Sequence, residues 1–598
     1  NNFIWKGIVG SSVYACVPPT HFITWNMPSQ IQENWEAYQD KETGGQTLNM
    51  YGYGDGGSGC TEEMLEMIRR FDKVSVMPKI EVTGGDAFLH KNLKDNTNLA
   101  TWDGELYLEM HRGTFTTKSN LKKANRTLEF KLRETELRAA LASLTGTSYP
   151  SEELTECYKK FLLNQFHDIL PGSHIHPVYE DAMNDYRSVS ERLDAMLALT
   201  AGNEYFNSLN FTRSSITFIE DENGAITRHG VKGFWSIPTL AGLSTGTVAA
   251  LPSKENWLST EFCDKCDCLV LETPYYRAKL SSDGSFVSLY DKELDREWVK
   301  EGCGFNKLHL YADNPGVYDA WDILPNYKDV QVALNVDKPL ALVSSDGSSA
   351  EFAVTFTTEK STWKMILRFF ADSRAIEVEN VVDWDEKHKL VKVNFGPDVL
   401  TRELVCDTSA GFVKRDLTKN TSWQQARFEV CHHKWCDMSE SGSGIAIINE
   451  GKYGVGLEKD EISLSLLRAT IRPDITSDIG HHDFCYTILP HSGDAVEAQV
   501  NKTAMEYNVP LCKSNVTVPA ALRDTLNNCG LYLQAMKRSE DGQYLILRLS
   551  EQDGRRGKIA FPFEVQTMNL IEDIEGSTKV VSYHPFELIT VAVKPEDL

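Results

Sequence analysis

The pattern of apolar and polar positions changes twice along the chain. In the first hundred residues, short apolar runs alternate with segments of helical composition. Runs 13–17, 47–53 and 74–77 predict strands, whereas 30–38 and 61–71 predict helices. Such alternation is typical of βα units around a mostly parallel sheet. Because the pattern stops after so few strands, we expect a remnant of an α/β domain here.

A helical periodicity replaces this pattern from about residue 100 to residue 203. Apolar side chains recur every three or four positions along three segments, which predicts three long amphipathic helices. Ser151 is expected at the N-cap of the second helix, where Glu152 and Glu153 suit the positive helix end. Short connections favour a three-helix bundle. The stripes consist of Leu121, Ala124, Leu128, Leu132 and Ala139; Leu154, Cys157, Phe161 and Leu162; and Ala182, Met183, Tyr186, Val189, Leu193 and Met196.

The helical pattern ends at residue 204, and short runs rich in β-branched and aromatic residues follow. Gly, Asp, Asn and Ser separate these runs, which is typical of an all-β region of sandwich type. Examples are 352–357, 363–370, 445–448 and 462–467. The sequence therefore predicts a multidomain α/β + α + β protein. Its expected domains are 1–98, the C-terminal part of an α/β catalytic domain; 99–203, the three-helix bundle; 204–265, a small β domain; 266–510, a large β-sandwich; and 511–598, a C-terminal β domain.

Composition narrows the classes of partner. The formal net charge of −24 argues against nucleic acid, because phosphate binding needs a basic surface. No window holds eighteen consecutive apolar residues, so we expect no membrane span. The thirteen cysteines are irregularly spaced, unlike a disulfide framework. With no visible leader sequence, a cytoplasmic setting is expected and a vacuolar or lysosomal one is less favoured. A homo-oligomer is compatible with the sequence.

A glycine-rich segment, Gly52-Tyr-Gly54-Asp-Gly-Gly57, fits the G-x-G-x-x-G pattern. A nucleotide-binding loop is one interpretation, with Glu81 placed roughly as the ribose-binding acid. Against it, Asp55 would set a negative charge against the pyrophosphate. A plain tight turn is a second interpretation. We favour a third, in which the glycines allow a sharp turn that presents Asp55 to a ligand.

Three further groups carry candidate chemistry. His167 follows a predicted helix, and local sequence alone favours a core histidine over a metal ligand, since catalytic zinc takes three or more protein ligands. The segment 102–113 collects Trp102, Arg112 and carboxylates, which suits either a carbohydrate site or the start of an amphipathic helix. Two cysteine clusters, 263–268 and 431–436, resemble no complete four-ligand zinc pattern, so small buried residues are the favoured interpretation.

Together and in this order, these motifs resemble glycoside hydrolase family 38, in its cytosolic, vacuolar and bacterial branch. The resemblance runs from about residue 3 to the C-terminus and is carried by long strings. The most specific are YGYGDGGSG (51–59), GELYLEMHRGTFTTKSNLKKANR (104–126), NQFHDILPGS (164–173), YYRAKLSSDGSFVSLYDKE (275–293) and NTSWQQARFEVCHHKW (420–435).

The resemblance implies a zinc-dependent retaining α-mannosidase that acts on mannose-containing glycans. It assigns His167 as a ligand of one Zn²⁺ ion, reversing the local interpretation. It also implies that Asp168 lies near the site as a substrate contact, with Trp102 and Arg112 as further substrate-binding candidates. Asp55 falls in the family's active-site loop and is the candidate catalytic acid.

The resemblance also places the start of this sequence beyond the family's first two zinc ligands and its nucleophile. None of the acids before Asp55, which are Glu33, Glu36, Asp40 and Glu42, is in a setting that suits a substitute nucleophile. Val9 stands where the family usually has Asp, which removes one candidate sugar contact. The competing hypothesis is therefore a catalytically inactive carbohydrate-binding or regulatory homologue.

Overall fold

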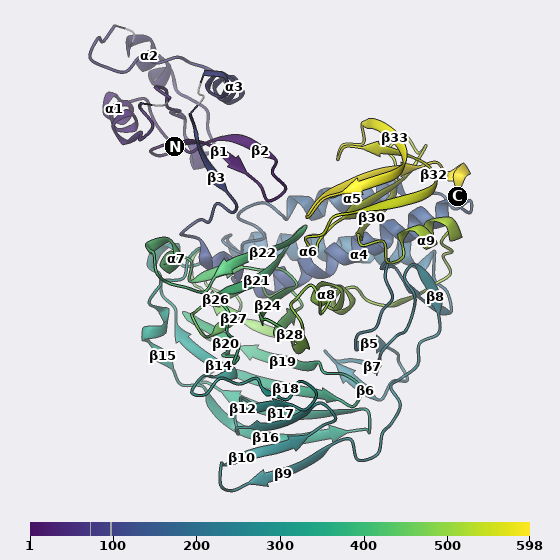
Figure 1. Cartoon of the computed structure of the whole chain (residues 1–598). Helices are drawn as coiled ribbons and strands as arrows, with labels where there is room; N and C mark the ends of the chain where they lie inside the picture. The colour runs from purple at the N-terminus through teal and green to yellow at the C-terminus, as the bar shows by residue number, and fades with distance from the viewer. Residues whose placement is uncertain (43, 72, 96–97) are drawn as a thin grey trace. The chain divides into compact units, whose positions relative to one another are not determined.

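The computed structural model describes residues 1–42, 44–71, 73–95 and 98–598. The chain forms two compact units, Asn1–Tyr107 and Leu108–Leu598. The fold class predicted from the sequence is confirmed, with a small mixed α/β unit, a helical bundle and extensive antiparallel β-structure (Figure 1). None of the helices in the described residues is both long and apolar enough to cross a bilayer.

The first unit is built on a three-stranded sheet of order β2-β1-β3. β1 pairs antiparallel with β2 and parallel with β3, so the expectation of a mostly parallel sheet is only half met. The predicted helices at 30–38 and 61–71 are present as α1 and α2. The elements are β1 (Asn2–Lys6), β2 (Ser12–Cys16), α1 (Pro28–Ala37), η1 (Gly54–Gly56), α2 (Glu62–Phe71), α3 (Gly85–Asp95) and β3 (Ala100–Asp103).

Two predicted strands of this unit, 47–53 and 74–77, are wrong. Side-chain hydrogen bonds replace a ladder in the first: the Asn34 amide donates to the Leu48 carbonyl at 3.2 Å, and the Thr24 hydroxyl donates to the Met50 carbonyl at 2.8 Å. In the second, Val76 is 88% exposed and the backbone turns, with the Met77 amide bonded to the Val74 carbonyl. Short apolar runs become strands only where a neighbouring strand pairs with them.

The predicted bundle is formed by α4 (Ser119–Ser143), α5 (Ser151–Leu163) and α6 (His176–Ala198). Most of the predicted stripe residues meet in one buried cluster that includes Leu121, Leu128 and Leu193. Ser151 is the first helical residue rather than the N-cap, which is Pro150. The second half of α4 extends beyond this cluster, where Leu137 and Leu141 pack into the core of the C-terminal sheet.

The large β region contains sheets of nine, six and five strands, and the predicted strands at 352–357, 363–370, 445–448 and 462–467 are all present. The nine- and six-stranded sheets share a core in which Phe395 and Tyr486 meet edge to face at 5.9 Å. The nine-stranded sheet comprises β16 (Asn335–Ser345), β17 (Ser349–Thr357), β18 (Thr362–Phe370), β19 (Ile376–Trp384), β28 (Gly480–Ser492), β25 (Ser443–Asn449), β24 (Trp435–Glu440), β21 (Glu403–Thr408) and β22 (Gly411–Asp416). The six-stranded sheet comprises β15 (Gln331–Val332), β14 (Phe305–Ala312), β20 (Lys389–Phe395), β27 (Ile462–Ala469), β26 (Gly454–Leu457) and β23 (Glu429–Cys431). The first of two five-stranded sheets comprises β13 (Arg296–Glu297), β12 (Phe286–Asp291), β11 (Tyr276–Leu280), β10 (Cys268–Glu272) and β9 (Ser259–Cys263).

Smaller sheets join distant parts of the second unit. β4 pairs with β29, which comes from the C-terminal part of the chain. The predicted domain boundaries stay predictions, although the boundary after residue 265 passes between β9 and β10, two paired strands. These sheets contain β4 (Glu204–Asn207), β8 (Ser244–Gly246) and β29 (Cys512–Ser514); β5 (Thr217–Glu220), β7 (Val231–Ser236) and β6 (Ile226–Arg228); and β30 (Tyr532–Arg538), β31 (Leu545–Ser550), β34 (Leu588–Val593), β32 (Gly557–Met568) and β33 (Ile574–Tyr583). The remaining helices are η2 (Arg112–Phe115), η3 (Gly316–Tyr318), η4 (Tyr327–Asp329), α7 (Ser422–Ala426), α8 (Val500–Asn508), α9 (Ala520–Leu526) and η5 (Pro595–Asp597).

Two histidines follow β23 directly, of which His432 is buried and His433 is half-buried. Burial lowers the pKa of both His432 and His433 to about 3, and the nearby guanidinium of Arg126 further disfavours a proton on either ring. The Nε2 atom of His432 lies 2.9 Å from the side-chain amide nitrogen of Asn449, which suits a neutral ring. Both rings are therefore neutral inside the folded protein at neutral pH.

We predict that the protein loses stability as the pH falls from about 6.5 to 3. In this window the unfolded chain binds protons on both histidines and the folded chain does not, so the free energy of unfolding falls with pH by up to ~1.4 kcal/mol per unit for each ring. Thermal unfolding at pH 7 and pH 5 should show a smaller acid loss for His432→Gln than for the wild type. His584→Gln, which alters an exposed histidine, is the matched control and should keep the wild-type loss.

Candidate active site

In the first unit, Asp55 lies on a tight turn that only glycine can form. It occupies the 3₁₀ turn η1, between Gly54 and Gly57, which have φ of +48° and +66°. A Cβ added at Gly54 would lie 2.3 Å from the Ile23 side chain. This backbone exposes the Asp55 carboxylate. No strand precedes the turn, so the strand–loop–helix context that a nucleotide-binding loop requires is missing from the described residues 44–71.

Trp102, also in the first unit, lies on β3 opposite Trp5 of β1. Its indole N–H donates to the Glu105 carbonyl at 3.0 Å, and the indole of Trp5 donates to the Gly104 carbonyl at 2.7 Å. These bonds shape the end of the strand, and the Trp102 ring is half-buried. A sugar contact by Trp102 stays a prediction.

In the second unit, His167 and Asp168 lie side by side in the turn between α5 and α6. The His167 Nε2 atom is 3.6 Å from the Asp168 Oδ2 atom, and their side chains are 77% and 47% exposed. The ring of Phe166 packs against the imidazole at 4.2 Å. The interpretation of His167 as a core histidine, which local sequence alone favoured, is therefore wrong. Its side chain is exposed to solvent. Ser173 donates to the Asp168 carboxylate at 3.1 Å and fixes its orientation.

Buried polar side chains of α4 anchor this turn, and sequence reasoning missed them. The ammonium of Lys122 donates to the carbonyls of Leu170 and Pro171, at 3.0 and 3.1 Å, and burial lowers the pKa of Lys122 to about 7. The Asn125 side-chain oxygen accepts from Gln165 at 2.6 Å. Asn125 was detectable, because it sits one turn beyond Leu121 on the apolar face of the helix, where an amide needs a partner.

Arg112 is the first residue of η2, and its side chain is buried. Its backbone amide donates to Asp322 at 3.1 Å, and its guanidinium donates to the Ala426 carbonyl at 3.0 Å. The guanidinium also stacks over the Phe428 ring at 4.6 Å. These contacts attach η2, which precedes α4 of the bundle, to the β region. The assignment of Arg112 as a sugar-binding residue stays a prediction.

The predicted zinc ligand meets only part of what zinc needs. An exposed imidazole with an adjacent carboxylate is a donor pair that zinc accepts. A catalytic zinc takes three protein ligands, however, and among the described residues no group of three candidate ligands forms around His167. Around His167, the described residues thus supply one ligand and an acidic neighbour, and do not by themselves complete a zinc site.

The cysteine clusters are separate from these residues. Cys266 and Cys268 form a disulfide at the end of the β9–β10 hairpin, so they are not metal ligands in this state. Cys431 lies at the end of β23, and Cys436 is buried in β24 opposite Cys406. This placement supports the interpretation of Cys436 as a small buried residue.

We predict that Gly172→Ala loosens the His167 turn. Gly172 has φ of +87°, and an added Cβ would lie 2.6 Å from the Thr117 carbonyl oxygen. Left-handed strain and this clash together should cost roughly 1–3 kcal/mol locally. Hydrogen exchange of residues 164–173 should accelerate at least tenfold. The control is Gly146→Ala, with φ of +99° but open space around it. Equal exchange in the two variants would show that the clash has no effect.

Comparisons with known proteins match most of the chain. Four domain descriptions of one family match in order: the glycosyl hydrolases family 38 N-terminal domain (residues 1–105), the alpha mannosidase middle domain (109–202), the family 38 C-terminal domain (271–476) and the family 38 C-terminal beta sandwich domain (530–591). The matched segments include both units and all five predicted site residues.

Individual relatives agree with the family match. Human alpha-mannosidase 2C1 is 30% identical over 584 residues, covering 93% of this chain and 55% of that protein. Alpha-mannosidase of Saccharomyces cerevisiae is 30% identical over 544 residues, covering 85% and 47%. An alpha-mannosidase structure from Enterococcus faecalis V583 has the same fold, with a TM-score of 0.77 at 12% identity, covering 99% of this chain and 82% of that one. The chain spans about half the length of the curated relatives it matches.

Proposed function

Because the chain belongs to glycosyl hydrolase family 38, we propose that the protein hydrolyses terminal α-mannosyl linkages of oligosaccharides or glycoconjugates. The observation that carries this proposal is the alignment of 93% of the chain with a protein named alpha-mannosidase. In the first unit the exposed carboxylate of Asp55, and in the second unit the exposed His167–Asp168 pair, each provide polar groups of the kind that bind sugar hydroxyls.

The proposed reaction retains the configuration at the anomeric carbon. Such hydrolysis uses two carboxyl groups roughly 5 to 5.5 Å apart, of which one attacks the sugar and the other protonates the leaving oxygen. We assign the second role to Asp55, because the glycine turn holds its carboxylate in solvent where a leaving group can reach it. Asp55 would then take a proton from water when the glycosyl intermediate is hydrolysed.

We further propose that His167 is a ligand of one Zn²⁺ ion in the active protein, with Asp168 as a substrate contact beside it. Zinc supplies a Lewis acid that binds and orients sugar hydroxyls. The described residues supply one ligand for it, so no reaction step is assigned to the metal. A cytoplasmic location is proposed as well.

Hydrolysis of an aryl α-mannoside by the purified full-length protein tests the proposal. Turnover that is specific for α-mannoside over α-glucoside is expected, together with a lower zinc content and at least tenfold slower turnover in His167→Ala. Exposed His481, which pairs with Asp383 far along the chain, provides the control His481→Ala. Binding of mannosides without any turnover would instead identify an inactive carbohydrate-binding homologue.

A further inference from the structure

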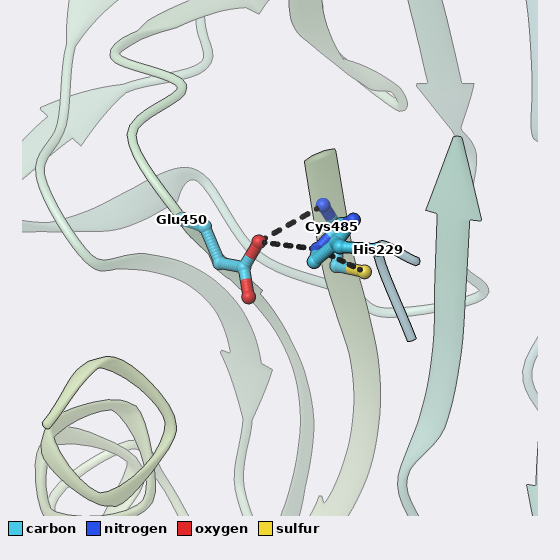
Figure 2. Close-up of side chains that lie close together, drawn as sticks. All are labelled: His229, Glu450 and Cys485. Atoms are coloured by element: carbon cyan, nitrogen blue, oxygen red, sulfur yellow. Dashed lines mark hydrogen bonds and ion pairs between the residues drawn. The ribbon is translucent and has the colours of Figure 1, made fainter. Parts of the chain in front are cut away.

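A histidine from a tight hairpin turn enters a cluster of charged side chains in the second unit. His229 and Gly230 connect β6 and β7, and both have positive φ, +49° and +76°. A two-residue connection with this backbone is a type I′ hairpin turn. The turn brings His229 against Glu450, which follows β25, and Cys485 on β28 (Figure 2).

The three side chains place their ligand atoms around one point. The His229 Nε2 atom lies 3.1 Å from the Glu450 Oε2 atom and 3.3 Å from the Cys485 Sγ atom. All three ligand atoms lie within 4.8 Å of one another. Zinc bonds of about 2.0–2.3 Å in a tetrahedron separate ligand atoms by roughly 3.3–3.7 Å. The two distances from His229 Nε2 are thus close to the ligand separations of such a site.

The surroundings of the three groups resemble the supporting contacts of a metal site. The second ring nitrogen of His229, Nδ1, lies 3.1 Å from the Asp483 Oδ2 atom and 3.4 Å from the Glu379 Oε1 atom. Neither contact has the geometry of a hydrogen bond. Carboxylates in this position orient metal-bound histidines. Arg228 holds the other oxygen of Glu450, Oε1, which leaves Oε2 to face the histidine. His229 and Glu450 are 14% and 16% exposed, so an ion can reach them.

The charge of the cluster also favours a cation. Three side chains with permanent positive charge, Arg228, Arg368 and Lys123, face five carboxylates. A divalent ion that replaces the thiol proton of Cys485 reduces this negative excess. The five carboxylates are Glu351, Glu377, Glu379, Glu450 and Asp483.

We propose that His229 Nε2, Cys485 Sγ and Glu450 Oε2 bind a zinc ion, with water as the fourth ligand. Binding releases the thiol proton, and any proton on Nε2, to solvent. The site is separate from the His167 turn and fixes the β6–β7 hairpin to the nine-stranded sheet. It does not depend on the proposed hydrolysis.

Titration of the metal-free protein with Co²⁺ tests the site. Cobalt in a tetrahedral site with one thiolate gives intense visible bands and a near-ultraviolet thiolate-to-metal band. The wild type should show both with one equivalent, and zinc should displace them. His229→Asn should lose them, while its fold is kept, because Asn-Gly is a preferred type I′ turn. Cys485→Ser should lose the thiolate-to-metal band, whether or not the remaining ligands still bind cobalt.

Three controls isolate the site. Cys436→Ser removes another buried thiol, Cys263→Ser removes a half-buried one, and His167→Ala removes the proposed active-site ligand. All three should keep the thiolate band. Zinc should also raise the unfolding temperature of the wild type more than that of His229→Asn. A wild-type titration without a thiolate band, or a band that survives in His229→Asn, would overturn the proposal.

Discussion

Replacing Asp55 by asparagine is expected to slow hydrolysis of an alkyl α-mannoside by roughly 10²–10⁴-fold, the usual contribution of a general acid. The 3₁₀ turn that holds Asp55 is made by flanking glycines and backbone hydrogen bonds, so asparagine should fit without strain. The fold should therefore be kept while the proton donor is lost. Steady-state kinetics on purified protein measure the effect.

The leaving group separates a general acid from a residue that merely binds sugar. An aryl mannoside with an acidic phenol needs little protonation, so Asp55→Asn should slow its first step far less than that of an alkyl mannoside. If Asp55 only binds the sugar, Asp55→Asn should slow hydrolysis of both substrates to the same extent. Asp86→Asn, in the first turn of α3, is the matched control and should change neither. Equal losses for the two leaving groups would reject the acid role.

Replacing Lys392 by methionine is expected to destabilise the β-sandwich by about 3–5 kcal/mol. Lys392 and Glu429 join β20 to β23, and both side chains are fully buried. The Nζ atom lies 2.5 Å from one carboxylate oxygen, while Ser465 donates to the other. Removing the ammonium would take away the cation that faces this buried carboxylate. Chemical denaturation would measure the loss.

A second substitution tests whether the buried charge causes this loss. In Lys392→Met/Glu429→Gln the buried carboxylate is gone and Ser465 keeps a partner, so more than 1 kcal/mol should be recovered. Lys300→Met is the control, because Lys300 and Asp460 form an exposed pair at 2.8 Å. Exposed pairs contribute only about 0–1 kcal/mol. Additive losses in the double variant would contradict the explanation.

The sequence predicted the elements whose side chains repeat with a clear period. The stripe through Leu121 and Leu128 predicted α4, and the run 352–357, rich in β-branched and aromatic residues, predicted β17. The segments 47–53 and 74–77 have strand-like composition, but their backbone partners are side chains and turns. Composition alone does not indicate whether a pairing strand is available.

The site residues divide in the same way. The glycine turn around Asp55 was predictable, because three closely spaced glycines with an acid in their midst indicate a sharp turn. Lys122 was not, since lysine in a helix is usually solvated, and only the folded turn places two carbonyls above its ammonium. The His229, Glu450 and Cys485 group comes from three distant segments, so no local pattern could indicate it.

The pairing of β4 with β29 has a consequence for how the protein is made. The Ser514 hydroxyl bonds to the Thr200 carbonyl at 2.9 Å, across 314 positions, and Leu137 of α4 packs in one core with Leu533 and Leu547. A ribosome releases the bundle long before it releases these partners. During that interval one apolar face of α4 and one strand edge stay uncovered. We therefore expect the nascent chain to expose apolar surface until residues 512–593 have emerged.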